Sequence, residues 1–197
     1  MLVDDFFADV DRRWTKREDR IPLHIIGSVA LLLGTDYRRG TKDSDVVQTR
    51  ELTDGIKARL LGVAGKGTAI HQRHGMYIEV VSSGFPFLPH VPLYHPVEAL
   101  NATLQHFEIH VLDVVDVVVS KLKPFRGSDI EDIRAMVDRD LVPHDRLLAR
   151  FRDAVDDYAG GAGADDIPKY VANLHRVERD LLGVDESEIE LPEWVGR

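Results

Sequence analysis

The stretch from residue 23 to residue 48 constrains the fold more than any other part of the chain. The apolar segment 23–26 is typical of a short strand, and a Gly27-Ser28 turn and an apolar helix follow it, with Ser28 placed to cap that helix. After a polar loop, the segment SDVVQ at 44–48 is typical of a second strand. Strands and helices that alternate in this way predict a mixed sheet accompanied by helices.

Further strands are expected in the first half of the chain. The segments TAIHQ (68–72) and MYIEVVS (76–82) are strand candidates joined by a hairpin turn at His74-Gly75, and FEIHVL (107–112) is another. Helices are expected at about 3–17 and 51–63. The proline-rich stretch 85–96 is expected to run as an extended surface connection, because proline interrupts helices and central strands. The sheet should therefore contain about five strands.

From Asp113 onward the hydrophobic pattern is helical, and the last predicted helix is IPKYVANLHRVERDLLG, residues 167–183. Asp113, Ser128 and Pro143 are suitable helix starts. The sequence thus predicts an α/β (α+β) protein, with a core domain over residues 1–112 and an all-helical C-terminal part over residues 113–197.

Composition excludes several classes of protein. The chain has 197 residues, is 44% hydrophobic and contains no cysteine, so it can bury a core without disulfides. Its 25 basic and 34 acidic residues give a net charge of −9, which disfavours a protein that coats nucleic acid through a generally basic surface. The opening residues lack the pattern of a signal peptide, and the longest apolar run, at 29–33, is too short to cross a bilayer. A cytoplasmic protein with no membrane partner is expected.

Two carboxylates on the second strand indicate a metal site. Asp43 and Asp45 are two residues apart, so on a strand they share a face while Ser44 points away. Two carboxylates side by side repel each other, and a divalent cation between them removes that repulsion. Mg²⁺, or Mn²⁺ in its place, is the expected cofactor, because it favours carboxylate, water and phosphate oxygens.

A phosphate site and a third acid complete the predicted constellation. A helix that begins at Gly27 and Ser28 presents unpaired N–H groups and a partial positive charge to a phosphate. Glu79 alternates with Ile78 and Val80, and it would join the acid pair if its strand lay beside theirs. Such a set suits in-line attack of a hydroxyl on an α-phosphate with release of pyrophosphate.

These residues resemble the nucleotidyltransferase superfamily with the polymerase-beta-like fold. The motif R-x-T-x-D-x-D consists here of Arg39, Thr41, Asp43 and Asp45. It is similar to the motif of minimal bacterial nucleotidyltransferases that include abortive-infection type toxins. The likeness covers roughly residues 20–138 and implies Asp43, Asp45 and Glu79 as metal ligands and catalytic residues. The sequence alone leaves open whether Arg38 or Arg39 contacts phosphate.

A second part of the resemblance lies downstream, in SKLKPFRGSDIEDI. It implies that Lys121 contacts the triphosphate, that Arg126 assists it, and that Asp129 orients one of these cations or acts in catalysis. The alternative for Lys121 is a lysine that snorkels out of an apolar helix.

The expected activity is Mg²⁺-dependent transfer of a nucleoside monophosphate from an NTP to an acceptor hydroxyl. The sequence does not identify the acceptor, because a tRNA end, a protein hydroxyl and a small molecule are all compatible with the predicted core. The resemblance also implies a toxin neutralised by a cognate antitoxin. The rival expectation is a non-catalytic nucleotide-binding or interaction protein that retains the fold.

Overall fold

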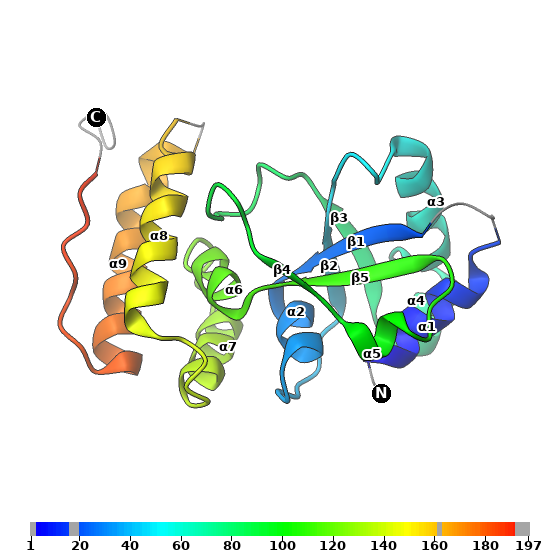
Figure 1. Ribbon diagram of the computed structural model, residues 1–197, viewed down its shortest axis with the longest axis horizontal. Helices are drawn as coiled ribbons and strands as arrows, with labels where there is room; N and C mark the ends of the chain where they lie inside the picture. Colours follow the sequence, from blue (N-terminus) through cyan, green and yellow to red (C-terminus); the bar gives the residue numbers. More distant parts are fainter. Residues whose placement is uncertain (1–2, 16–19, 161–162, 192–197) are drawn as a thin grey trace. The chain divides into compact units, whose positions relative to one another are not determined.

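The computed structural model describes residues 3–15, 20–160 and 163–191. The chain divides into two compact units, each described here by itself (Figure 1). The sheet unit comprises Met1–Phe85 and Tyr94–Asp113, and the helical unit comprises Pro86–Leu93 and Val114–Arg197.

The sheet unit contains a five-stranded sheet in the order β3-β2-β1-β5-β4. Its strands are β1 Ile21–Ile26, β2 Asp43–Val47, β3 Tyr77–Val81, β4 Tyr94–Pro96 and β5 Phe107–Leu112. The β1/β5 and β2/β3 pairs are parallel, while the β1/β2 and β4/β5 pairs are antiparallel. The predicted mixed sheet of five strands is therefore confirmed.

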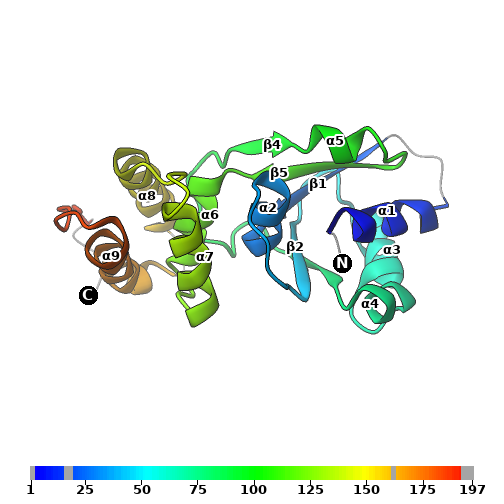
Figure 2. The same cartoon turned by 90° about the horizontal axis from the view of Figure 1, so that it is seen from below.

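Helices of the sheet unit pack around this sheet. They are α1 Val3–Arg13, α2 Gly27–Gly34, α3 Asp54–Ala64, α4 Ala69–His74 and α5 Glu98–Asn101. Figure 2 shows α1, α3 and α4 gathered on the same side of the strands. Alternate strand residues are buried, among them Leu23, Val46, Ile78 and Ile109, because a strand presents every second side chain to the same face. The intervening residues, which include the predicted acids, therefore belong to the other face.

One predicted strand is wrong. Residues 69–74 form helix α4, because the Thr68 hydroxyl accepts the His71 N–H at 3.2 Å and caps the helix. Gly75 ends α4 with a left-handed φ of +64°, so the expected hairpin turn is a helix C-terminus. The fifth strand is instead β4, which lies at the edge of the sheet, where Pro96 is tolerated.

The helical unit contains only helices and connecting segments among its described residues. Its helices are α6 Val114–Lys121, α7 Gly127–Val137, α8 His144–Tyr158 and α9 Ile167–Val177, with a 3₁₀ turn at Ala164–Asp166 and a π-helical turn at Glu178–Leu182. The proline-rich stretch is more than a surface connection, since Phe87 is fully buried against Phe151 and Tyr170. No helix within the described ranges is long and apolar enough to cross a membrane.

Candidate active site

The three predicted acids lie on one face of two neighbouring strands. Strand β2 exposes Asp43, leaves Asp45 half-buried and turns Ser44 into the core. Strand β3 runs parallel to β2, and the Cα of Glu79 is paired with that of Asp45. Cross-strand partners share a face, so Asp43, Asp45 and Glu79 stand together, and we call them the acidic face.

Tyr77 lies within the electrostatic influence of all three carboxylates. Tyr77 is the Cα partner of Asp43 and lies on the same face of the sheet. Burial raises the pKa of its hydroxyl, and the negative charges of Asp43, Glu79 and Asp45 raise it further. No lysine or arginine among the described residues forms an ion pair with Asp43 or Glu79. Asp43 and Glu79 therefore keep negative charge that a cation would stabilise.

The Gly27 turn meets the acidic face. Gly27 joins β1 to α2 with a φ of +66°, a conformation that costs other residues energy. A Cβ atom at this position would lie 3.1 Å from Asp45 Oδ2. The absence of a side chain thus lets the backbone at the start of α2 approach the Asp45 carboxylate, and it brings the predicted phosphate site and metal site together.

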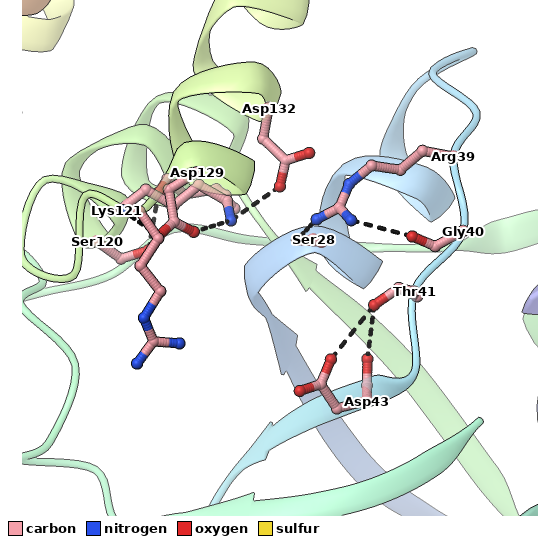
Figure 3. A network of polar contacts seen from close by, with 11 residues as sticks. Ser28, Arg39, Gly40, Thr41, Asp43, Ser120, Lys121, Asp129 and Asp132 are labelled. Atoms are coloured by element: carbon pink, nitrogen blue, oxygen red, sulfur yellow. Dashed lines mark hydrogen bonds and ion pairs between the residues drawn. The ribbon is translucent and has the colours of Figure 1, made fainter. Parts of the chain in front are cut away.

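Ser28 does not cap α2 as the sequence predicted. The helix begins one residue earlier, at Gly27, with Ile26 as its N-cap residue and no side-chain cap. The Ser28 hydroxyl instead accepts a hydrogen bond from the Arg39 guanidinium (Figure 3). The same guanidinium donates to the carbonyl of Gly40 at 3.0 Å. A cation is therefore held at the first turn of α2.

The loop before β2 positions its two arginines differently. Arg38 donates to carbonyls of Leu32 and Thr35 at the far end of α2. Arg39, by contrast, reaches Ser28, and Thr41 Oγ1 donates to Asp43 Oδ1 at 3.3 Å. Of the two candidates left open by the sequence, Arg39 is the one that the fold brings to the Gly27-Ser28 turn.

The side chains of the acidic face do not form a complete Mg²⁺ site by themselves. Within the described ranges, no group of three or more histidine, aspartate or glutamate side chains is arranged to hold a metal ion. Mg²⁺ in phosphate-transfer sites is commonly bound by one or two carboxylates, with waters and substrate phosphates as further ligands. The oxygen donors of Asp43 and Asp45, next to a turn suited to phosphate, fit that mode.

The helical unit holds the second predicted group of residues. Lys121, at the end of α6, is buried, and its Nζ lies 2.9 Å from Asp129 Oδ1 and 2.9 Å from Asp132 Oδ2 (Figure 3). The other oxygen of Asp129 accepts the backbone N–H of Arg126 at 2.9 Å, while the Arg126 side chain is exposed. Lys121 is therefore held between two carboxylates and does not snorkel into solvent.

Two residues of these clusters were missed by sequence reasoning. Asp132 is fully buried and forms an ion pair with Lys121, a role that the sequence does not single out. Its spacing of three residues from Asp129 places both acids on one face of α7, which was the available signal. Tyr77 is the cross-strand partner of Asp43, and this partnership depends on the parallel β2/β3 pairing, which the sequence does not show.

Comparison with protein families assigns the chain to a class. Residues 5–175 match the model of a family described as nucleotidyltransferases of unknown function (DUF6036). The match spans most of the chain, so the protein belongs to this nucleotidyltransferase family. No curated protein and no solved structure matches it.

Proposed function

We propose that this chain transfers a nucleoside monophosphate from an NTP to an acceptor hydroxyl and releases pyrophosphate. The observation that carries the proposal is the approach of the Gly27 backbone to the Asp45 carboxylate. It puts a turn suited to phosphate beside a pair of strand carboxylates, which is the juxtaposition that attack on a phosphate requires.

The turn at the start of α2 would bind the triphosphate. Its unpaired N–H groups and the positive end of the helix favour an anion there. Arg39 is already hydrogen-bonded to Ser28 and adds a full positive charge. In the bound state the guanidinium would exchange Ser28 or the Gly40 carbonyl for phosphate oxygens, a stronger charge-assisted contact.

The acidic face would hold the metal through Asp43 and Asp45, with Glu79 as the third carboxylate. Bound Mg²⁺, or Mn²⁺, would supply electrostatic stabilisation of the attacking and leaving oxygens. Thr41 restrains Asp43 through its hydroxyl, so that this carboxylate is oriented before any ligand arrives. Ordering the acids in advance lowers the cost of assembling the site.

Lys121 and Arg126 are proposed to contact the triphosphate, as the resemblance of SKLKPFRGSDIEDI implies. The two carboxylates that contact Lys121 fix its amine, which supports a positioned charge. Asp129 also fixes the Arg126 backbone, so it is proposed to orient both cations.

A toxin role is a more specific proposal, and it rests only on the sequence motif from Arg39 to Asp45. Expression of the wild-type chain is expected to arrest bacterial growth, and co-expression of a neighbouring cognate antitoxin gene is expected to restore it. The Asp45→Ala variant should permit growth in either case. Arrest that persists with Asp45→Ala would separate toxicity from nucleotidyl transfer.

Pyrophosphate release tests the proposal directly. The purified chain is incubated with each NTP, Mg²⁺ and a mixture of hydroxyl acceptors, and pyrophosphate is measured over time. Asp45→Asn is expected to reduce the rate by about a thousandfold or more, since it removes a metal ligand at the reacting phosphate. NTP binding without pyrophosphate from any acceptor would favour the rival, a non-catalytic nucleotide-binding protein.

A further inference from the structure

The side from which the acceptor approaches follows from the order of the strands, given the proposed function. In phosphoryl transfer the attacking and leaving oxygens lie roughly in line through the phosphorus. Pyrophosphate would leave at the α2 turn, which follows β1, and the acids stand on β2 and β3. The acceptor hydroxyl must then come from the β3 side, which is the open edge of the sheet.

An aromatic ring stands at this edge. Tyr77 opens β3, is half-buried and lies on the same face as Asp43. The His71 ring meets it edge-on at 5.2 Å between centroids, and the Lys66 Nζ lies 5.9 Å from its centre. One ring is thus flanked by a histidine and a lysine beside the acidic face.

The two flanking groups are suited to an anion. His71 Nδ1 accepts the Gly67 N–H at 2.9 Å, so the ring proton is carried by Nε2, which is a donor. Lys66 is exposed, and no carboxylate among the described residues pairs with it. The Lys66 ammonium lies over the Tyr77 ring, and no carboxylate among the described residues neutralises it, so it can bind a phosphate brought to the ring.

We propose that Tyr77, His71 and Lys66 form the acceptor subsite, and that it takes a nucleotide with a free hydroxyl. The base stacks on Tyr77, as bases do on aromatic side chains, and Lys66 and His71 bind the phosphate. Because β3 is the last strand, a polynucleotide acceptor can continue beyond the sheet, and a free nucleotide offers the same ring and phosphate. A peptide hydroxyl offers neither.

The step balances without another reactant. The acceptor oxygen forms a bond to the α-phosphorus, and the bond from that phosphorus to the bridging oxygen breaks. Pyrophosphate leaves with the electron pair, and the hydroxyl proton passes to a carboxylate of the acidic face.

The test uses the full-length chain, Mg²⁺ and NTPs labelled in the α-phosphate. Three acceptors are offered: a short ribo-oligonucleotide with a free 3′ hydroxyl, AMP, and a peptide containing serine, threonine and tyrosine. Label is expected on a nucleotide acceptor, and the first two arms show whether an RNA end or a free nucleotide is used. An oligonucleotide without its terminal hydroxyls should stay unlabelled.

Variants separate stacking from folding. Tyr77→Ala is expected to raise the KM for the nucleotide acceptor about tenfold to a hundredfold, whereas Tyr77→Phe keeps the ring and should change it less than about twofold. Lys66→Ala should raise the KM and weaken its dependence on salt. Lys57→Ala is the matched control, because Lys57 Nζ bonds Gln48 and lies outside the proposed subsite.

The outcomes that overturn the proposal are distinct from those that overturn the activity. Label on the peptide alone, or Tyr77→Ala equal to wild type on the nucleotide acceptor, would overturn the subsite and leave nucleotidyl transfer standing. Loss of activity with Tyr77→Phe would show that the hydroxyl acts, and not the ring, and would overturn the stacking role. No label on any acceptor, with no pyrophosphate formed, would overturn both.

Discussion

The acidic face of the sheet unit and the buried Asp116–Arg150 pair of the helical unit hold their carboxylates in opposite ways. On the acidic face, Asp43 and Glu79 are exposed carboxylates with no cation paired to them among the described residues. In the helical unit, the buried carboxylate of Asp116 receives two hydrogen bonds of 2.6 Å from Arg150. The two exposed carboxylates lack a paired cation among the described residues, and the buried one is neutralised within the fold.

This difference predicts which charges stabilise the protein. A buried carboxylate whose partner is removed remains as an uncompensated charge, so breaking the pair is costly. Neighbouring carboxylates that repel each other cost stability as long as no cation is bound. Substitutions in the Asp116–Arg150 pair should therefore destabilise the protein, whereas substitutions of the acids on the acidic face should leave it folded.

The largest expected effect is on the Asp116–Arg150 pair. Asp116→Ala removes the buried carboxylate that Arg150 bonds, and it also removes the acceptor of the Leu93 N–H, which Asp116 bonds at 2.9 Å. The free energy of unfolding should fall by about 3–5 kcal/mol in urea titrations. Replacing both residues, as Asp116→Leu with Arg150→Met, should restore much of the loss. A loss below about 1 kcal/mol for the single variant would contradict the account of this pair.

Lys121 tests whether the neutralised cluster also serves the nucleotide. Lys121→Ala is expected to weaken NTP binding or turnover by one to three orders of magnitude, at about 1.4 kcal/mol for each factor of ten. It should also lower stability, because Asp129 and Asp132 lose their common cation. Binding is therefore measured by calorimetry at a temperature where circular dichroism shows the variant folded.

Lys123→Ala is the control for Lys121. Lys123 lies two residues further on and bonds the Tyr158 hydroxyl at 2.6 Å, so it does not share the contacts of Lys121. Equal and small effects of the two variants on NTP binding would restrict the active site to the sheet unit.

A smaller effect is expected at Gly27. Gly27→Ala places a methyl group 3.1 Å from Asp45 Oδ2 in a left-handed conformation, which should cost about 1–2 kcal/mol of stability. It should also weaken Mg²⁺-dependent NTP binding by displacing the carboxylate. Gly62→Ala is the matched control, because Gly62 lies inside helix α3 with open space at its Cβ, where alanine is favourable. Unchanged nucleotide affinity in Gly27→Ala would mean that the close approach is not needed.

The sequence predicted the acid strands well because their pattern is strictly local. Asp43, Asp45 and Glu79 alternate with core residues, and alternation alone assigns a face. The sequence did not predict helix α4, because six residues are too few to show helical periodicity. Thr68, which caps this helix, was instead assigned to a strand. Strand β4 was hidden by prolines that only an edge position tolerates.

Contacts between residues that are far apart in the chain could not be predicted from the sequence. The spacing of Gly27, Ser28 and the two aspartates predicted a joint site, but not that Arg39 would bond Ser28. Likewise, nothing local indicates that Lys121 is buried between two carboxylates of the next helix. Such contacts depend on how the elements pack, which periodicity does not encode.

The central claim, that the acidic face is kept for a metal and a nucleotide, is tested most directly by measuring NTP binding and unfolding on the same variants. Asp43→Asn and Asp45→Asn are each expected to abolish the Mg²⁺-dependent part of NTP binding in calorimetry. In the absence of metal, their unfolding midpoints should stay at the wild-type value or rise, with a gain of up to about 2 kcal/mol from relieved repulsion. If both variants instead unfolded as readily as a truncation of the core, or bound Mg²⁺ and NTP like the wild type, the carboxylates would be structural and the claim would be contradicted.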